Sequence, residues 1–236
     1  MPKVFGPEHL LFLAVTIAVT TAGLLCAKKF LRTERSRRLL LRCLGAALFV
    51  SVLSNRISLS AVKFPGEWIR LIPDSFCGMS SLVLSLSLLF GKKDGHLLHF
   101  VWFMALLGGT LTLAYPDFIG QADSVFYMPT ITGLLHHAID VAAVVACLVF
   151  GHIRPTFRRW YCQPIGFFAY MTVGAFLISA GGMTDAFYLF EPILPGTPLT
   201  VWVMVPIYAA LYAATMLGFA AAHGKKTSEA IPRPQA

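Results

Sequence analysis

The chain has 236 residues, of which 57% are hydrophobic and only 13% are charged, and its mean hydropathy is +0.72. That much apolar surface exceeds what the core of a water-soluble domain absorbs, so a soluble globular protein is excluded. The net charge of +8 includes a basic run from Lys28 to Arg42, which in a soluble protein would indicate nucleic-acid binding. In an apolar chain such a run more often sets membrane topology beside anionic headgroups, so we expect no nucleic-acid partner.

Seven segments are apolar enough to cross a bilayer, which takes about 20 residues of helix. In chain order they are residues 9–27, 39–61, 68–90, 97–114, 128–150, 164–181 and 198–222. The first is followed by Lys28 and Lys29 without a small-residue cleavage pattern, so we expect it to stay as a helix and not to be removed as a signal peptide. The sequence predicts an all-α bundle of seven transmembrane helices in one domain, residues 1–222, and a polar, disordered tail, residues 223–236.

Lysine and arginine residues fall mostly in alternate loops between these segments. With the N-terminus outside, the inner loops hold the run from Lys28 to Arg42, then Lys92 and Lys93, then Arg154 to Arg159, and most acidic residues lie outside. The positive-inside rule therefore predicts an outer N-terminus and a cytoplasmic C-terminus. We expect a multi-pass integral protein of the cell membrane, with a bacterial inner membrane as its location.

This topology separates one cysteine from the other four. Cys77 alone lies in the outer half, and the odd number of cysteines argues against a disulfide framework. The remaining cysteines lie at cytoplasmic helix ends, where a reducing compartment keeps them as thiols: Cys26, Cys43, Cys147 and Cys162. A lone cysteine is more often a small buried apolar residue than a nucleophile, so the residues at its depth decide between the two interpretations.

Several ionisable residues share the predicted depth of Cys77. The third and fifth segments both descend from the outer side, and Cys77 and His136 lie about the same number of residues below their outer ends. Asp140 lies one helical turn after His136 and His137, and Asp74 lies one turn before Cys77. Because ionisable groups inside a membrane usually face a cavity and pair with one another, this cluster indicates chemistry.

A thiol becomes a nucleophile when a base removes its proton, and an imidazole is the usual base. We therefore predict a catalytic group of Cys77, His136 or His137, and Asp140, in which the carboxylate orients the imidazole. Which histidine faces Cys77 stays open, because adjacent helical residues point about 100° apart. Arg56 is a candidate donor to a developing oxyanion. Its neighbour Asn55, His9 at the mouth of the first segment and Asp74 are further candidate substrate contacts.

Short motifs along nearly the whole chain carry a family resemblance. They are FGPEHL at 5–10, IPDSFC at 72–77, GG at 108–109, YPDF at 115–118, LLHH at 134–137, TDAFYLFEP at 184–192 and VPIY at 205–208. Together they resemble the YwaF-like integral membrane family, which includes the animal transmembrane protein 164, a polytopic lipid acyltransferase. The resemblance implies cysteine-thioester acyl transfer with Cys77 as nucleophile and His136 as base, a phospholipid or other acyl lipid as partner, and no cofactor or metal. It also places Asp185 and Tyr188 among the substrate contacts.

The chain departs from the family pattern at two positions. Ser75 stands where the family has a histidine two residues before the cysteine, and the family has an asparagine near the position of Asp185. A role that depends on either of those family side chains does not carry over to this chain.

Two other functions stay open. A small-molecule transporter or substrate-binding membrane component is favoured by the central polar groups and by the glycine pairs at 108–109 and 181–182, although small residues are ordinary in helix packing. A metal-dependent intramembrane lipid hydrolase is a second alternative, since histidine and aspartate bind zinc, but the last segment lacks two histidines one turn apart. A retinal protein is excluded because residues 198–222 contain no lysine.

Overall fold

The computed structural model describes residues 5–116, 124–194 and 196–229, and these ranges are helical without any β-strand. The α-helices are α1 Pro7–Phe30, α2 Glu34–Val62, α3 Phe76–Phe90, α4 His96–Ala114, α5 Met128–Val149, α6 Cys162–Ser179 and α7 Val201–Glu229. Two short 3-10 helices, Trp68–Leu71 and Phe157–Arg159, precede α3 and α6. All α-helices except α3 are long and apolar enough to cross a membrane, which gives six candidate spans in the described ranges. The predicted all-α membrane protein is confirmed, whereas seven crossings and the orientation stay predictions.

The prediction of one continuous helix over residues 68–90 is wrong. A 3-10 helix, Trp68–Leu71, is followed by an extended link and only then by α3, which has 15 residues. Pro73 explains the break, because it has no amide hydrogen and disfavours helical geometry at Ile72, whose ψ is 128°. Ser75 then caps the new helix by accepting a hydrogen bond from the amide of Gly78. Cys77 therefore lies in the first turn of α3 and not nine residues inside a long helix.

Helix α7 also differs from the predicted boundary. It continues to Glu229, beyond the end expected at residue 222, and contains Pro206 within its first turns. Residues 230–236 of the predicted disordered tail lie outside the described residues.

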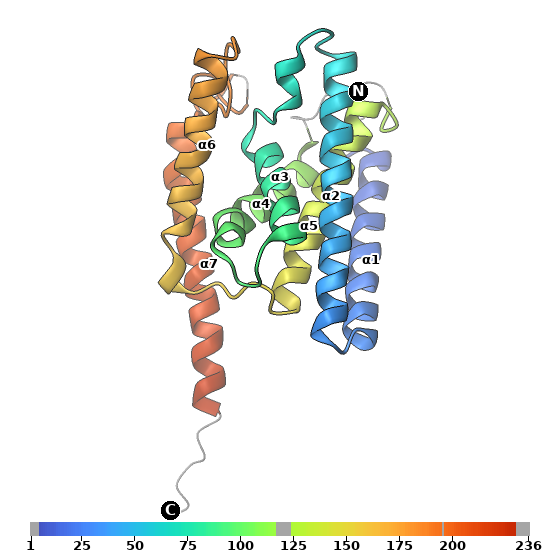
Figure 1. Ribbon diagram of the computed structural model, residues 1–236, viewed down its shortest axis with the longest axis vertical. Coiled ribbons are helices and arrows are strands. Elements are labelled where there is room, and N and C mark those ends of the chain that lie inside the picture. The colour runs from blue at the N-terminus through green and yellow to red at the C-terminus, as the bar shows by residue number, and fades with distance from the viewer. Residues whose placement is uncertain (1–4, 117–123, 195, 230–236) are drawn as a thin grey trace, which may run out of the picture.

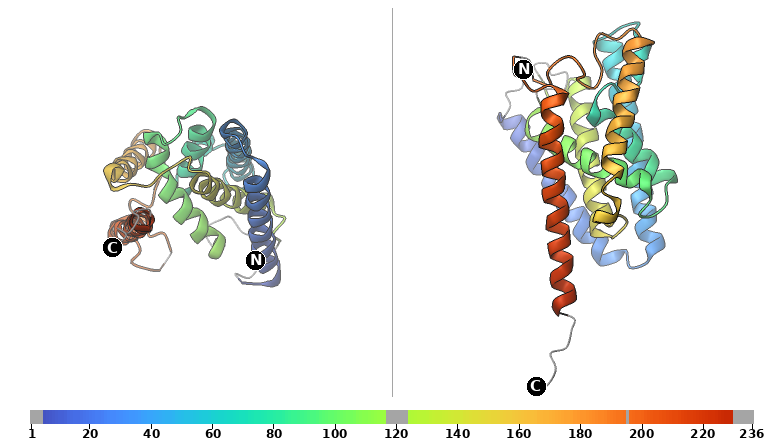
Figure 2. Two further views of the ribbon diagram at one scale, coloured as in Figure 1. Left: turned by 90° about the horizontal axis from the view of Figure 1, so that it is seen from below. Right: turned by 90° about the vertical axis from the view of Figure 1, so that its left-hand side faces the viewer.

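The helices form a bundle with α2, α3, α4 and α5 at its centre. Figure 1 shows α1 at one edge and α6 with α7 at the other, and the view from below in Figure 2 shows the same order. Fully buried side chains from the central helices and α6 make the core, among them Leu48, Leu84, Ala105, Ala143 and Leu177. Helix α1 has a single buried residue, His9, and is apolar on all sides, as expected of a helix that faces lipid.

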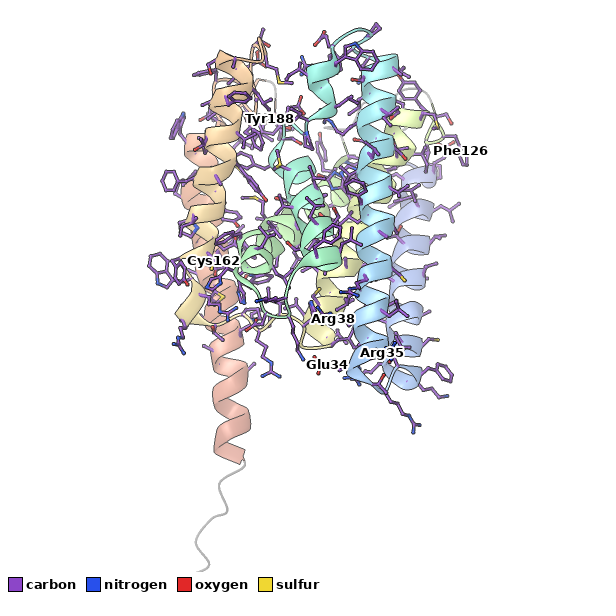
Figure 3. All side chains as sticks on the ribbon, viewed as in Figure 1. Glu34, Arg35, Arg38, Phe126, Cys162 and Tyr188 are labelled. Carbon is purple, nitrogen blue, oxygen red and sulfur yellow. The ribbon has the colours of Figure 1, made fainter. Side chains whose placement is uncertain are left out.

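The bundle has two ends, the Arg70 end and the Glu34 end. The Arg70 end carries the start of α3, the 3-10 helix Trp68–Leu71 and the link between α6 and α7, including Tyr188. The opposite, Glu34 end carries Lys28 and Lys29 at the end of α1 and Arg35, Arg37 and Arg38 at the start of α2. Figure 3 shows Tyr188 near the first end and Glu34, Arg35 and Arg38 at the second.

Candidate functional site

A cavity of about 740 Å³ lies within the bundle and extends to Arg70. Its walls are mostly apolar side chains from α4 and α7: Met104, Leu107, Leu111, Met204, Ile207 and Leu211. The volume falls within the range of about 300 to 1,000 Å³ that is usual for small-molecule sites. An apolar cavity of this size suits an alkyl chain.

Most of the predicted site residues line this one cavity. They are Asn55, Arg56, Asp74, Cys77, His136, His137 and Tyr188. The predicted residues that lie outside its lining are His9, Asp140 and Asp185. The structure therefore brings the thiol and both imidazoles to one space, although within the described residues no hydrogen bond joins Cys77 to either histidine.

Cys77 lies at the second residue of α3 and packs against α4. A methyl group added at Gly108 would lie 2.7 Å from its Sγ, so the absence of a side chain there creates the space that the thiol fills. Its Sγ lies 3.9 Å from the hydroxyl oxygen of Thr112, one turn further along α4.

His136 is held on α5 by one of its ring nitrogens. Its Nδ1 lies 3.3 Å from the carbonyl oxygen of Thr132, and its Nε2 is buried without a hydrogen-bond partner in the described chain. A carbonyl oxygen only accepts, so Nδ1 carries the hydrogen of the neutral ring. The lone pair is therefore on Nε2, the atom that a general base uses.

His137 stacks on its neighbour, with ring centroids 3.9 Å apart and an angle of 38° between the planes. Both rings are nearly inaccessible to solvent, and both line the cavity. The rotation of 100° between adjacent residues therefore does not separate the two side chains, since their rings converge. Nδ1 of His137 has no hydrogen-bond partner in the described residues.

Asn55 fixes the start of α5 against α2. Its amide Nδ2 donates to the carbonyl oxygen of Pro129 and to the hydroxyl oxygen of Thr132, at 3.2 Å each. Thr132 is also the residue whose carbonyl holds His136. The side chain of Asn55 thus supports the position of the imidazole, a role that the sequence did not indicate.

Arg56 anchors the link before α3. Its Nε and Nη2 donate to the carbonyl oxygen of Arg70 at 2.9 and 2.7 Å, and Nη2 also donates to the carboxylate of Asp74 at 2.9 Å. Arg70 contacts the second oxygen of the same carboxylate at 3.1 Å. Asp74 precedes α3, so its predicted place on the helical face of Cys77 is wrong. The described donors of Arg56 serve this link, which determines where α3 begins.

Asp140 is completely buried, and neither carboxylate oxygen has a hydrogen-bond partner in the described residues. It lies on the α4 side of α5, because a methyl group added at Gly109 would be 3.5 Å from its Oδ2. Its electrostatic contacts include Cys77 and Ser81 of α3. The predicted hydrogen bond that would orient a histidine is not formed in this arrangement.

Two further predicted contacts have local structural partners. His9 joins α1 to the end of α4, since its Nε2 lies 2.8 Å from the carbonyl oxygen of Leu113 and its Nδ1 accepts from the amide of Phe5. Asp185 closes a turn by accepting a hydrogen bond from the amide of Phe190 at 3.1 Å. Both residues lie outside the cavity lining.

The cavity also contains polar residues that sequence reasoning missed. Thr112 lies beside the thiol, and Lys63 and Arg70 add positive charge at the outer part of the lining. Tyr208 of α7 lines the apolar part and donates its hydroxyl hydrogen to Gln163 of α6. Thr112 follows Gly108 by one turn, which is the only signal in the sequence that places it near Cys77.

A metal-dependent hydrolase requires several side chains that can bind one metal ion together. Within residues 5–116, 124–194 and 196–229, no three side chains of histidine, cysteine, aspartate or glutamate converge on a point where a metal ion would fit. This arrangement offers no ligand set of the kind that zinc enzymes use.

Together these features define a polytopic, all-helical membrane protein with an apolar internal cavity that contains a thiol and two imidazoles. A model of the TMEM164 family matches residues 4–222, and the chain belongs to that family. The family relationship expected from the sequence motifs is confirmed. Comparison with curated proteins and with solved structures gave no match.

Proposed function

We propose that this protein is a membrane-embedded acyltransferase that moves a fatty acyl group between lipids through a thioester on Cys77. The observation that carries the proposal is that Cys77, His136 and His137 line one apolar cavity of about 740 Å³. A thiol with nearby bases and apolar walls combines the two requirements of this chemistry, a nucleophile and a site for the acyl chain.

The distribution of charge along the cavity supports a lipid substrate. The apolar walls of α4 and α7 accept an alkyl chain, while Lys63 and Arg70 lie toward the Arg70 end. Cations there suit a phosphate group, since arginine and lysine are the usual phosphate partners. The positive-inside pattern supports placing this end at the outer leaflet, with the N-terminus outside.

In the first half-reaction, Nε2 of His136 takes the thiol proton and the sulfur of Cys77 attacks the ester carbonyl of the donor lipid. The amide of Cys77 and the Thr112 hydroxyl, 3.9 Å from Sγ, are donors beside the developing oxyanion. The bond from the carbonyl carbon to the lipid oxygen breaks, and that oxygen takes the proton from the imidazolium. The products are a lysolipid and an acyl thioester.

In the second half-reaction, an acceptor hydroxyl group replaces the lysolipid. The neutral imidazole of His136 removes its proton, and its oxygen attacks the thioester carbonyl. The carbon–sulfur bond breaks, and the thiolate recovers the proton. The acyl group has then moved from one lipid to the other without any oxidant, reductant or cofactor.

The proposal is tested by intact-mass measurement of the purified protein after incubation with phospholipid vesicles. We expect an adduct of one acyl mass that neutral hydroxylamine removes, and no adduct in Cys77→Ala. Cys43→Ala is the matched control, since Cys43 is an exposed thiol of α2 that does not line the cavity, and it should keep the adduct.

Unchanged lipid remodelling in Cys77→Ala would disprove the thioester mechanism. Lipid or solute movement across proteoliposomes that Cys77→Ala does not affect, without any change in lipid composition, would favour the transporter alternative instead.

A further inference from the structure

Asp140 is a buried carboxyl group that forms no ion pair with any described side chain. It lies in the middle of α5 with no exposed surface, and both of its carboxylate oxygens lack a hydrogen-bond partner. A buried carboxylate is costly unless a counter-charge or a proton accompanies it. The feature is separate from the cavity, because Asp140 does not line it.

Oxygen atoms from two other helices face this carboxylate. Ser81 of α3 donates its hydroxyl hydrogen to the carbonyl oxygen of Cys77 at 2.9 Å, and its oxygen also interacts with Asp140. The hydroxyl of Tyr170 on α6 interacts with both Asp140 and Ser80. The Ser80 and Tyr170 hydroxyls are buried and, like the carboxylate, have no hydrogen-bond partner in the described chain. The carboxylate and these two hydroxyls therefore lie close to one another with unused hydrogen-bonding capacity, which leaves their oxygens available to a shared ligand.

The glycine at position 109 lets α4 approach α5 closely beside this carboxylate. A methyl group there would lie 3.5 Å from Oδ2 of Asp140 and 2.9 Å from a methyl carbon of Val141. The neighbouring serines of α3 show the contrast, since Ser85 and Ser87 donate to carbonyl oxygens of their own helix at 2.6 and 2.7 Å. Ser80 therefore differs from them in having an oxygen that is free for another partner.

No described cation reaches Asp140. The groups that interact with it are Ser81, Tyr170 and the Cys77 thiol, whereas the nearest arginine of the site, Arg56, interacts with His136. The two imidazoles are the other titratable groups of α5, and neither hydrogen-bonds to the carboxylate. Either a proton on the carboxyl group or a cation from outside the described side chains therefore balances the charge of Asp140.

We propose that Asp140, with Ser80, Ser81 and Tyr170, forms an intramembrane binding site for a sodium ion. A carboxylate and hydroxyl oxygens are hard ligands, which suit alkali and alkaline-earth cations and not zinc or copper. One carboxylate balances one positive charge, so a monovalent ion leaves the site neutral, whereas a divalent ion would leave a buried net charge.

The site connects α3, α5 and α6, so an ion there stabilises the folded bundle in proportion to its concentration. The test is the midpoint of thermal unfolding of the full-length protein in detergent, measured in NaCl, KCl, CaCl2 and choline chloride at equal ionic strength. We expect a saturable rise of about 2 to 4 °C in NaCl over choline chloride, and a smaller rise in KCl.

Two variants identify the site. Asp140→Asn removes the charge and should abolish the sodium response. Ser80→Ala keeps the carboxylate and should raise the NaCl concentration for half of the effect by about tenfold, which still tests the site if Asp140→Asn does not fold. Glu34→Gln is the control, because Glu34 is an exposed acid at the opposite end of the bundle, and its sodium response should be unchanged.

Three results would overturn the proposal. They are an equal midpoint in NaCl and choline chloride, a sodium response that persists in Asp140→Asn, and a larger response to CaCl2 than to NaCl. A midpoint that follows pH alone would show that a proton supplies the counter-charge. None of these results bears on the thioester, which the mass measurement tests separately.

Discussion

Cys77 of α3 and Gly108 of α4 are in direct contact, and a methyl group at position 108 would lie 2.7 Å from the thiol sulfur. The close approach of the two helices at this point determines the position of Sγ relative to the cavity. The same glycine pair contacts α5 through position 109, so adjacent residues of α4 pack against the thiol of α3 and against α5 beside Asp140.

We predict that Gly108→Ala displaces the thiol and lowers the rate of acyl-adduct formation by about a hundredfold, since misplacement by an ångström has effects of that size. The overpacking should also cost about 1 to 3 kcal/mol of stability. Gly218→Ala is the matched control, because an added methyl group there meets nothing within 4 Å. A Gly108→Ala protein that is acylated at the normal rate would show that the contact does not position the nucleophile.

The hydrogen bond to Thr132 favours His136 as the base of the proposed mechanism. We expect His136→Gln to lower the rate of acyl-adduct formation by about 10² to 10⁴, the usual contribution of general base catalysis. His137→Gln should have a smaller effect, because it leaves Nε2 of His136 in place. Time courses of intact mass for both variants decide the assignment, and the reverse order of effects would give the role to His137.

Asp74 holds the link that precedes α3. Its carboxylate pairs with Arg56 and Arg70, and the side chains of Arg56 and Asp74 are only 8% and 20% exposed. We predict that Asp74→Ala lowers the free energy of unfolding by about 3 to 5 kcal/mol, because it leaves a buried guanidinium unpaired. Glu67→Gln removes an ion pair with Arg70 whose acid is 51% exposed, and it should cost less than about 1 kcal/mol. Denaturation in mixed detergents measures both, and equal costs would contradict the prediction.

We predict that His152, at the Glu34 end, makes the stability of the protein depend on pH. Burial, followed by the charges of Lys93 and Arg38, lowers the pKa of His152 from 6.5, while Glu34 and Asp94 oppose the shift. The unfolded chain then binds a proton more readily than the folded one, so this group destabilises the protein as pH falls below about 6.5.

The measurement is the unfolding midpoint at pH 7.5 and at pH 5.5 for the wild type and for His152→Gln. We expect the variant to lose less stability on acidification than the wild type. His96→Gln is the comparison, since His96 lies at the start of α4 on the same end. An identical loss in the wild type and His152→Gln would rule out this histidine as a source of the pH dependence.

Much of the fold followed from local sequence properties. Hydropathy over about 20 residues predicts a spanning helix because each helix satisfies its own backbone groups and needs no partner to exist in a bilayer. The boundaries of α4 and α5 therefore agree with prediction to within a few residues. The break before α3 also had a local signal in Pro73. The prediction of a continuous helix was wrong because a hydropathy average over about 20 residues does not register a single proline.

The sequence by itself determined that the protein is helical and membrane-embedded, that Cys77 stands apart from the other cysteines, and that two histidines and an aspartate lie on one later helix. Only the tertiary structure decided which of these side chains share a space. Cavity lining depends on how each helix is rotated and how closely its neighbours approach, and these depend on distant residues such as Gly108. For that reason the structure gathers Cys77, His136 and His137 in one cavity and turns Asp140 toward the serines of α3.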